Sequence, residues 1–214
     1  MKRLLSLVLV LLGALALAMT FERATPEGAK TEANRFAIAR YRVDASQSKF
    51  MVRAFSGGLL WFKGHDHFIA VRDFSGEAQV TPGTPSLQMT IRADSLVETR
   101  DLFTEQQKQI INKELREIVL ETAKYPEITF KSTDVTGQIA DGQFEAKIGG
   151  DLTLHGVTHR LVIPAKVTLS GDTLRAQGEF TVSRHDYNVQ ATSALHGMIR
   201  VRDELRFTFD IVAH

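Results

Sequence analysis

The stretch Leu59–Thr81, LLWFKGHDHFIAVRDFSGEAQVT, decides the fold class of this chain. In its second half, from Phe74 to Thr81, small or apolar residues alternate with polar ones. A period of two places one face of a strand on a core and the other face in water. The stretch therefore predicts a strand, a tight corner and a second strand, which is half of an antiparallel β architecture.

The rest of the chain repeats this pattern, with one interruption. From residue 128 onward, short β-patterned segments alternate with glycine-containing turns. Between them and the opening stretch, Thr104 and Gln107 fit a capping box, and apolar residues follow at helical spacing until the helix ends at Lys124–Pro126. These apolar positions are Ile111, Leu115, Ile118 and Val119. The sequence predicts an otherwise all-β domain with one amphipathic helix.

Short strands at near-regular spacing favour either a sandwich or a closed barrel. The chain has 13 Phe but 1 Trp, and many of the Phe lie on the inner phase of predicted strands. A barrel of about eight strands leaves an interior that is filled by side chains or holds one slender ligand. Phe130, Phe180 and Phe207 are candidate lining residues of such a tunnel. A fully packed barrel without a ligand is the alternative.

The N-terminus predicts export. Lys2 and Arg3 precede an apolar run, Leu4–Ala18, that ends in a small-x-small pattern typical of a signal peptide. The run is shorter than the roughly 20 residues of a spanning helix, although an uncleaved anchor is left open. We expect a signal peptide over 1–18, a flexible spacer over 19–39, a single domain over 40–214 and a periplasmic or secreted location.

Composition excludes several function classes. The chain has no cysteine, so it is neither a disulfide-stapled scaffold nor a lipoprotein acylated on cysteine. Its 26 basic and 25 acidic residues give a net charge of +1, which argues against nucleic acid as a partner. A Gly-x-Ser-x-Gly elbow and the glycine-rich nucleotide motifs do not occur. We therefore expect no enzyme activity and no cofactor; the oligomeric state is not predicted.

The histidine pair His65 and His67 offers an alternative. Residues two apart on an extended strand project on the same side, so both imidazoles could chelate one metal while Asp66 points away. A mononuclear site needs a third ligand, for which His155 and His159 are the obvious candidates, with His185 and His196 behind them; the alternative set is His65, His67 and His155. The chain would then be a metal-binding protein or a metal-dependent hydrolase. Otherwise the two histidines belong to the rim of a binding cavity.

Other residues of the opening stretch suggest such a cavity. Leu60, Trp61 and Phe62 resemble the entrance of an apolar tunnel, and Phe68 resembles part of its wall. Arg184 lies four residues after Phe180 and so shares its strand face. If that face points inward, the positive charge of Arg184 points inward too. We therefore expect Arg184, with His65 and His67, near the polar head of a ligand.

The order of several short motifs resembles the YceI-like polyisoprenoid-binding family. These motifs are Tyr-Arg-Val-Asp at 41–44, Gly-His-Asp-His at 64–67, Phe-Ser-Gly at 74–76, Lys-Tyr-Pro-Glu-Ile-Thr-Phe at 124–130, Leu-Thr-Leu-His-Gly-Val-Thr at 152–158 and Val-Arg-Asp-Glu-Leu at 201–205. The resemblance covers roughly 41–213. It implies a lipocalin-like, eight-stranded antiparallel β-barrel, with the helix across part of it and an apolar internal tunnel.

The resemblance also implies a function. We expect the chain to bind an amphiphilic isoprenoid lipid or quinone, for sequestration or transport in the periplasm, with a transient membrane contact left open. One departure concerns the turn after Phe180, where Asn188 stands in place of the glycine that the family often has. Asparagine tolerates the left-handed conformation that glycine would supply, so the turn can survive.

Overall fold

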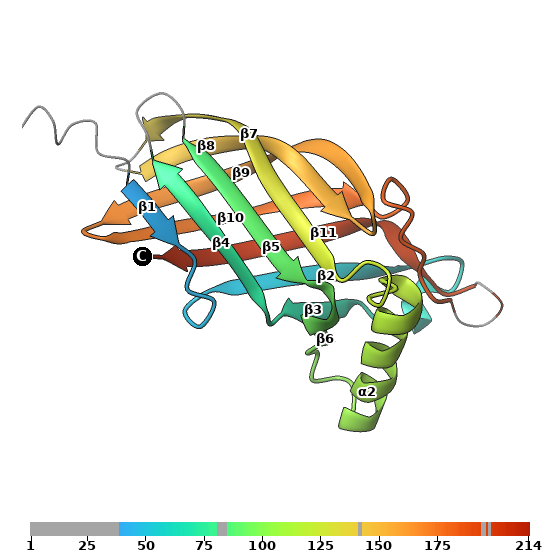
Figure 1. Cartoon of the computed structure of the whole chain (residues 1–214). Coiled ribbons are helices and arrows are strands. Elements are labelled where there is room, and N and C mark those ends of the chain that lie inside the picture. The colour runs from blue at the N-terminus through green and yellow to red at the C-terminus, as the bar shows by residue number, and fades with distance from the viewer. Residues whose placement is uncertain (1–38, 81–84, 141–142, 194–195, 197) are drawn as a thin grey trace, which may run out of the picture. The chain divides into compact units, whose positions relative to one another are not determined.

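The structure is a computed structural model that describes residues 39–80, 85–140, 143–193, 196 and 198–214. These residues form one antiparallel sheet with the strand order β1-β4-β5-β7-β8-β9-β10-β11-β2-β3-β6 (Figure 1). The strands are β1 (Ala39–Arg42), β2 (Lys49–Gly57), β3 (His67–Val71), β4 (Phe74–Val80), β5 (Ser86–Arg92), β6 (Leu96–Glu98), β7 (Glu127–Ala140), β8 (Gln143–Leu154), β9 (Val157–Ser170), β10 (Thr173–Ser183) and β11 (Arg200–Ala213).

The sheet curls back on itself because two of its long strands bend at one corner. β3 and β4 are consecutive in the chain but lie far apart in the strand order, and β5 and β6 are separated by the 3-10 turn Ala93–Ser95. Backbone hydrogen bonds run across the corner from Arg72 N to Ser95 O (3.3 Å) and from Arg92 N to Asp73 O (3.0 Å). The predicted strand, corner and strand of the opening stretch are confirmed.

The sheet has more strands than the eight that we predicted: the corner divides β3 from β4 and β5 from β6, which adds two segments, and the short β1 is a third. Eight strands have seven or more residues, while β1, β3 and β6 have four, five and three. The predicted all-β, barrel-like antiparallel fold with one helix is confirmed, as a curled sheet that has eleven strand segments among the described residues where we predicted eight.

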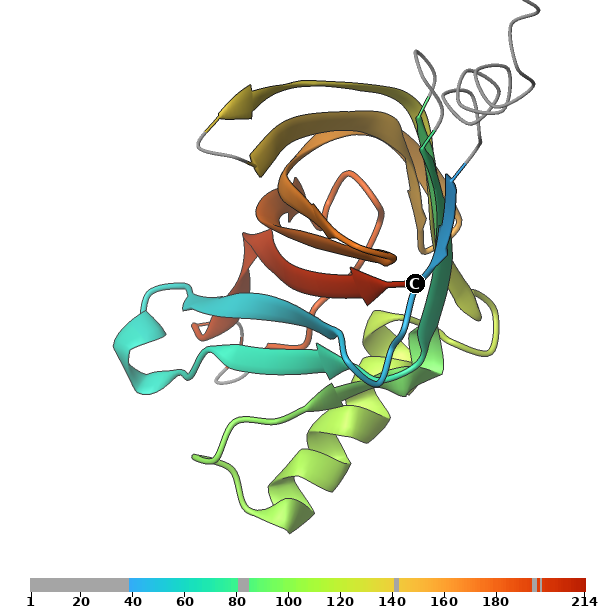
Figure 2. The ribbon, with the colours of Figure 1, turned by 90° about the vertical axis from the view of Figure 1, so that its left-hand side faces the viewer.

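β1 joins the end of β11 on the other side of the curl. Val43 forms an isolated antiparallel bridge with Ala213. Arg42 and His214 exchange backbone hydrogen bonds of 2.7 and 2.9 Å. Figure 2 shows how the strands curl round, with the C-terminus beside β1.

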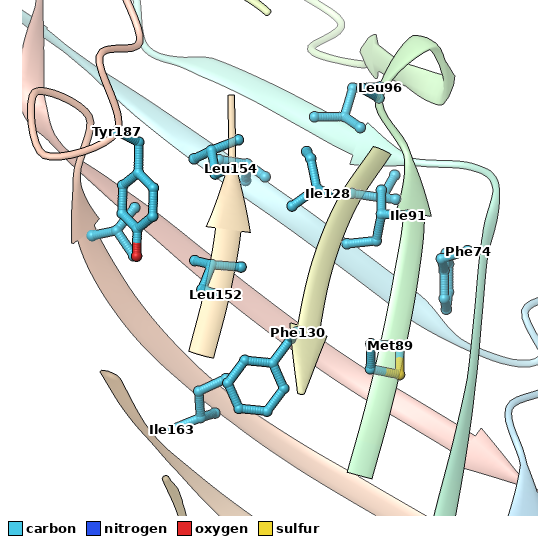
Figure 3. Packing of buried hydrophobic residues seen from close by; sticks show 14 of the residues in the cluster. Phe74, Met89, Ile91, Leu96, Ile128, Phe130, Leu152, Leu154, Ile163 and Tyr187 are labelled. Carbon is cyan, nitrogen blue, oxygen red and sulfur yellow. The ribbon is translucent and has the colours of Figure 1, made fainter. Parts of the chain in front are cut away.

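The concave face of the sheet carries the core. Phe74, Met89, Ile91, Phe130 and Ile163 come from β4, β5, β7 and β9 and are all buried (Figure 3). They follow the period of two that the sequence shows, so each strand turns alternate residues inward. This core is what surrounds the candidate site.

One helix closes part of the curl. α2 (Glu105–Glu114) begins with the predicted capping box, in which Gln107 N donates to Thr104 Oγ1 (3.3 Å) and Thr104 N donates to Gln107 Oε1 (2.9 Å). Asn112 on this helix accepts a hydrogen bond from Glu98 N (2.7 Å) at its Oδ1 and so ties α2 to β6. Within the described part of the chain, no helix is both long and apolar enough to span a membrane.

α2 continues into a π-helical turn, Leu115–Val119. This turn changes which side chains of the helix face the core. Leu115 and Val119 pack against the core, but Ile118, which we expected beside them, is 53% exposed. A π turn has more residues per turn than an α-helix, so a residue three positions on no longer returns to the same face. The π-type bond from Leu120 N to Leu115 O measures 2.9 Å.

The predicted signal peptide and nearly all of the predicted spacer lie outside the described residues. Ala39, which we placed last in the spacer, is the first residue of β1.

Candidate functional site

The space inside the curled sheet contains two adjoining cavities. The first, which we call the mouth chamber, has a volume of about 160 Å³, and the second, the inner chamber, has about 100 Å³. Their walls share five residues, so the chambers meet in the middle of the fold. The shared residues are Phe50, Ile91, Ile128, Leu152 and Phe180.

The inner chamber is apolar. Among its lining side chains, that of Thr129 is the exception, and the rest are aliphatic or aromatic. Phe130, Ile163 and Phe209 contribute to this wall from β7, β9 and β11. Such a wall offers a ligand dispersion contacts and removal from water, and it offers almost no hydrogen bonds.

The mouth chamber combines an apolar wall with a few polar groups. The wall includes Phe207 and Leu205 from β11. The polar lining residues come from β3, from α2 and from the segment after β10, and they are His67, Glu114, Arg184, Gln190 and Thr192. The two chambers together therefore form an amphiphilic site with a polar end and an apolar end.

His67 is held by a buried carboxylate. Its Nδ1 lies 2.7 Å from Oε2 of Glu98, whose side chain is fully buried. The other carboxylate oxygen, Oε1, accepts backbone hydrogen bonds from Phe68 (3.2 Å), Thr99 (3.0 Å) and Arg100 (2.8 Å). The ring of Phe103 stacks on the imidazole at 5.4 Å. The position and orientation of His67 are thus fixed from two sides.

These contacts keep Glu98 ionised. Burial of the Glu98 carboxyl would raise its pKa, but the hydrogen bonds from His67 and from the backbone N–H groups of Arg100 and Phe68 hold that pKa below its ordinary value. An ionised carboxylate can only accept, so the proton between the two side chains belongs to Nδ1 of His67. In the neutral imidazole, Nε2 therefore carries a lone pair and accepts hydrogen bonds.

Arg184 is positioned by the backbone around it. Its Nη1 donates to Val189 O (3.0 Å) and its Nε to Arg202 O (3.3 Å). The turn that follows contains Asn188 with a φ of 54°, which confirms that asparagine takes the left-handed conformation there. The turn brings Val189 and Gln190 to the wall of the mouth chamber.

The histidines do not gather around a metal. His65 is exposed, and Asp66 turns away from it to accept hydrogen bonds from Arg53 and from Ser56 N. His155 lies in the β8–β9 turn with a φ of 51°, and its ring packs on Tyr125 at 4.2 Å. In the described ranges, no group of three or more His, Asp or Glu side chains is arranged to hold a metal ion. His155 therefore does not supply the third ligand that we considered.

The three residues that we expected at the entrance of an apolar tunnel do not line either chamber. Trp61 and Phe62, which belong to the 3-10 turn Trp61–Lys63, are 55% and 63% exposed, and neither they nor Leu60 line a chamber. Gly58, with a φ of 87°, turns the chain away from the sheet directly after β2, so these side chains leave the inward phase.

Phe68 is also outside both chambers. It alternates with His67 and Ile69, which line the mouth chamber, so its side chain lies on the opposite face of β3. There the guanidinium groups of Arg53 and Arg100 lie 5.2 and 5.5 Å from its ring centroid.

Of the ten residues that the sequence suggested for ligand contact, half line the chambers. His67, Arg184 and Phe207 lie in the mouth chamber, Phe130 lies in the inner chamber and Phe180 lies in both. Leu60, Trp61, Phe62, His65 and Phe68 lie in neither. Sequence reasoning missed Glu98 and Gln190. The signal for Glu98 was a charge on the apolar phase of the short strand β6, two residues after the buried Leu96.

Comparison with known proteins places the chain in a family. The model of the YceI-like domain matches residues 41–213. A UPF0312 protein of Pseudomonas fluorescens is 35% identical over 102 residues, which are 42% of this chain and 50% of that protein. Protein YceI of Escherichia coli O6:H1 is 36% identical over 118 residues, which are 54% of this chain and 53% of that protein. The matches span about half the length of these curated relatives.

Two solved structures share the fold. The crystal structure of Burkholderia cenocepacia BcnA superposes with a TM-score of 0.62 at 22% identity and covers 80% of this chain and 99% of that one. A polyisoprenoid binding domain from Saccharophagus degradans gives a TM-score of 0.59 at 15% identity and covers 83% and 99%. At these identities the likeness establishes the fold alone. The family match over residues 41–213 goes further, and this chain belongs to the YceI-like family.

Proposed function

We propose that this protein binds an amphiphilic isoprenoid lipid or quinone within the two chambers and sequesters or carries it in the periplasm. One observation carries the proposal. The mouth chamber, which has polar groups, continues into an inner chamber whose wall is almost entirely apolar. The site thus has the same polarity gradient as a lipid with a polar head and a prenyl tail. The polyisoprenoid-binding description of the Saccharophagus relative supports this ligand class.

The energetics favour a long apolar tail. Each methylene moved from water into an apolar wall contributes about 0.8 kcal/mol. Association and ordering of the ligand oppose binding by roughly 4–15 kcal/mol. A tail of some twenty carbons therefore exceeds this cost, whereas a single isoprene unit does not. The length of the tail, more than the head, sets the affinity.

The head is recognised at the mouth. Nε2 of a neutral His67 is a hydrogen-bond acceptor, because Glu98 holds the proton on Nδ1. Such an acceptor suits the hydroxyl group of a prenol or a quinol. Gln190 and Arg184, which line the same chamber, add donors for carbonyl or anionic oxygens. The mouth therefore has partners for both redox forms of a quinone.

Ligand identification tests the proposal. The protein purified from its native host is extracted with organic solvent, and the extract is analysed by mass spectrometry. We expect a prenyl compound in stoichiometric amount. An extract without any prenyl compound, from protein that also fails to take up an added prenol or prenylquinone, would contradict the proposal.

A pair of variants links the ligand to the cavity. Leu152→Phe adds bulk where the chambers meet, and should lower retention of a long-chain prenyl compound. Val162→Phe adds larger bulk on an outward position of β9 that is 57% exposed, and should retain the ligand. Equal retention by both folded variants would place the ligand outside the chambers.

A further inference from the structure

The connection between β2 and β3 exposes three large apolar side chains together. We call residues Leu59–Lys63 the tip. Leu59 is 79% exposed and Phe62 63%, the two highest values among the large apolar residues that the structure describes, and Trp61 is 55% exposed. The rings of Trp61 and Phe62 meet edge to face at 6.4 Å. Exposed apolar groups clustered in this way mark an interaction surface.

Part of the backbone of the tip is hydrogen-bonded within the protein. Leu60 N donates to Met198 O (2.9 Å), Trp61 N to Gly58 O (3.3 Å) and Lys63 N to Leu60 O (2.9 Å). Trp61 O accepts from Gly64 N (3.0 Å) and from the hydroxyl of Ser56 (2.8 Å). A segment that enters a lipid environment must satisfy its backbone groups internally, because lipid offers them no partners. The N–H groups of Leu60, Trp61 and Lys63 and the carbonyl of Trp61 meet this requirement.

The tip lies near the mouth chamber. It follows β2 directly, and Ser56 near the end of β2 pairs with Val201, which lines the mouth chamber. In Figure 1 the β2–β3 connection lies at the end of the sheet opposite the C-terminus. A surface that meets the tip therefore lies close to the mouth chamber.

Charges at the base of the tip are mainly positive. Lys63 is exposed on the tip itself. Below it, Arg202 donates to Ser56 O (2.9 Å), and Arg53 pairs with Asp66 at 2.7 Å. These contacts set three cations against one carboxylate. Basic groups beside exposed aromatic side chains are the combination that anionic lipid surfaces attract.

We propose that the tip inserts into the interface of an anionic lipid bilayer and holds the mouth chamber against the membrane. Tryptophan and phenylalanine settle at the boundary of headgroups and acyl chains, while lysine reaches the phosphates. The role of this contact rests on the proposed function: it would let a lipid pass directly between the bilayer and the chamber. The geometry of the tip does not depend on which ligand the chambers hold.

Trp61 is a built-in probe, because it is the one tryptophan of the chain. The full chain is mixed with vesicles of phosphatidylglycerol and phosphatidylcholine whose acyl chains carry bromine, a contact quencher of tryptophan. We expect a blue shift of the emission and strong quenching, both weaker with phosphatidylcholine alone. The apolar run Leu4–Ala18 can itself hold the protein on vesicles. The readout is therefore the emission of Trp61, which reports on the tip, and not the amount of protein retained.

Matched variants locate the contact. The double variant Leu59→Ala, Phe62→Ala keeps Trp61 and removes exposed apolar surface from the tip. We expect the lipid concentration for half-maximal quenching to rise about tenfold or more. The control is Leu169→Ala, which removes a side chain that is 56% exposed at the other end of the sheet, where Leu169 pairs with Leu174 and Leu174 with Ala213. This control should behave as the wild type.

Three results would overturn the inference. They are an unchanged Trp61 emission at saturating vesicle concentration, equal responses of the tip variant and Leu169→Ala, and a blue shift that depends on protein concentration without vesicles. The last would assign the tip to contact between two copies of the chain. Failure of the proposed function gives a different pattern, in which Trp61 is quenched by vesicles but the protein takes up no prenol. Failure of this inference alone leaves prenol uptake from detergent intact.

Discussion

Two histidines of this protein each lie beside a glutamate. In one pair the glutamate is the buried partner, and in the other the histidine is. In the first pair His67 is 29% exposed and Glu98 is fully buried; in the second His155 is 7% exposed and Glu121 is 43% exposed. The distances are nearly equal, 2.7 and 2.8 Å. Their geometry differs, because His67 Nδ1 is hydrogen-bonded to Glu98, whereas neither buried ring nitrogen of His155 has a hydrogen-bond partner among the described residues.

Burial separates their roles. A buried carboxylate that three backbone N–H groups also contact is part of the scaffold, and it orients a ring that lines a cavity. A buried ring with a half-exposed carboxylate does the opposite: His155 fills the space beside Tyr125 in a tight turn, and Glu121 is partly in solvent. The first pair presents an imidazole to the mouth chamber, whereas the second packs in a turn.

The largest difference should appear when the glutamates are removed. Glu98→Ala leaves the N–H groups of Phe68, Thr99 and Arg100 without their carboxylate, and should lower the free energy of unfolding by about 2–4 kcal/mol. Glu121→Ala removes a half-exposed partner and should cost about 1 kcal/mol or less. Urea denaturation measures both. Equal losses would show that the two carboxylates have the same role.

The second test removes the histidines and should separate affinity from stability. His67→Ala should weaken binding of a prenol about threefold to tenfold, the range of one hydrogen bond. His155→Ala should leave prenol affinity unchanged and lower the free energy of unfolding by about 1–3 kcal/mol, because it empties the space beside Tyr125. Titration calorimetry and denaturation are run on both variants. A loss of affinity in His155→Ala alone would reverse the assignment.

A smaller effect should follow Glu98→Gln, which changes the tautomer of His67. The amide oxygen can still accept from the backbone, but the amide nitrogen donates to Nδ1, so the imidazole proton moves to Nε2. The preference for a hydroxyl head over a carbonyl head should then fall severalfold. Nitrogen-15 NMR of the imidazole reports the tautomer, and paired titrations with a prenylquinol and a prenylquinone report the preference. If the tautomer changed but the preference for a hydroxyl head did not, His67 would not be a contact of the ligand head.

The smallest effect should be seen in acid. The hydrogen bonds from His67 and the backbone outweigh burial and keep the pKa of Glu98 below its ordinary value in the folded protein. The unfolded chain therefore takes up this proton first as the pH falls, so the stabilisation is complete above the ordinary carboxyl range and is lost as the pH passes down through the folded pKa. Glu98→Gln should flatten this part of a plot of stability against pH. Glu121→Gln is the control, and a flattening in that variant instead would contradict the account.

Strand periodicity predicted more of this molecule than its loops did. Phe130, Phe180 and Phe207 were placed on inward phases by the period of two, and the structure puts all three in the chamber walls. Trp61 and Phe62 lie in a turn without a period, where an apolar side chain carries no information about inside or outside. The turn that Gly58 introduces sends them to solvent.

The pairing of His67 with Glu98 could not be predicted from local sequence. It depends on the register of β3 against β6, in which Ile69 lies opposite Glu98, and that register follows from the bend at the corner. The outward rotation of Ile118 likewise depends on a π-helical turn that the helical spacing did not reveal. Tertiary contacts and local irregularities, which leave weak traces in sequence, determined these parts of the site.

The central claim is that the two chambers together hold a prenyl tail. It is tested most directly by titrating the protein with prenyl alcohols of increasing length and the same hydroxyl head. The account predicts that affinity rises with each added isoprene unit until the chambers are full and is then constant, and that Leu152→Phe moves this plateau to shorter chains. An affinity independent of chain length, or a plateau that Leu152→Phe leaves in place, would contradict it.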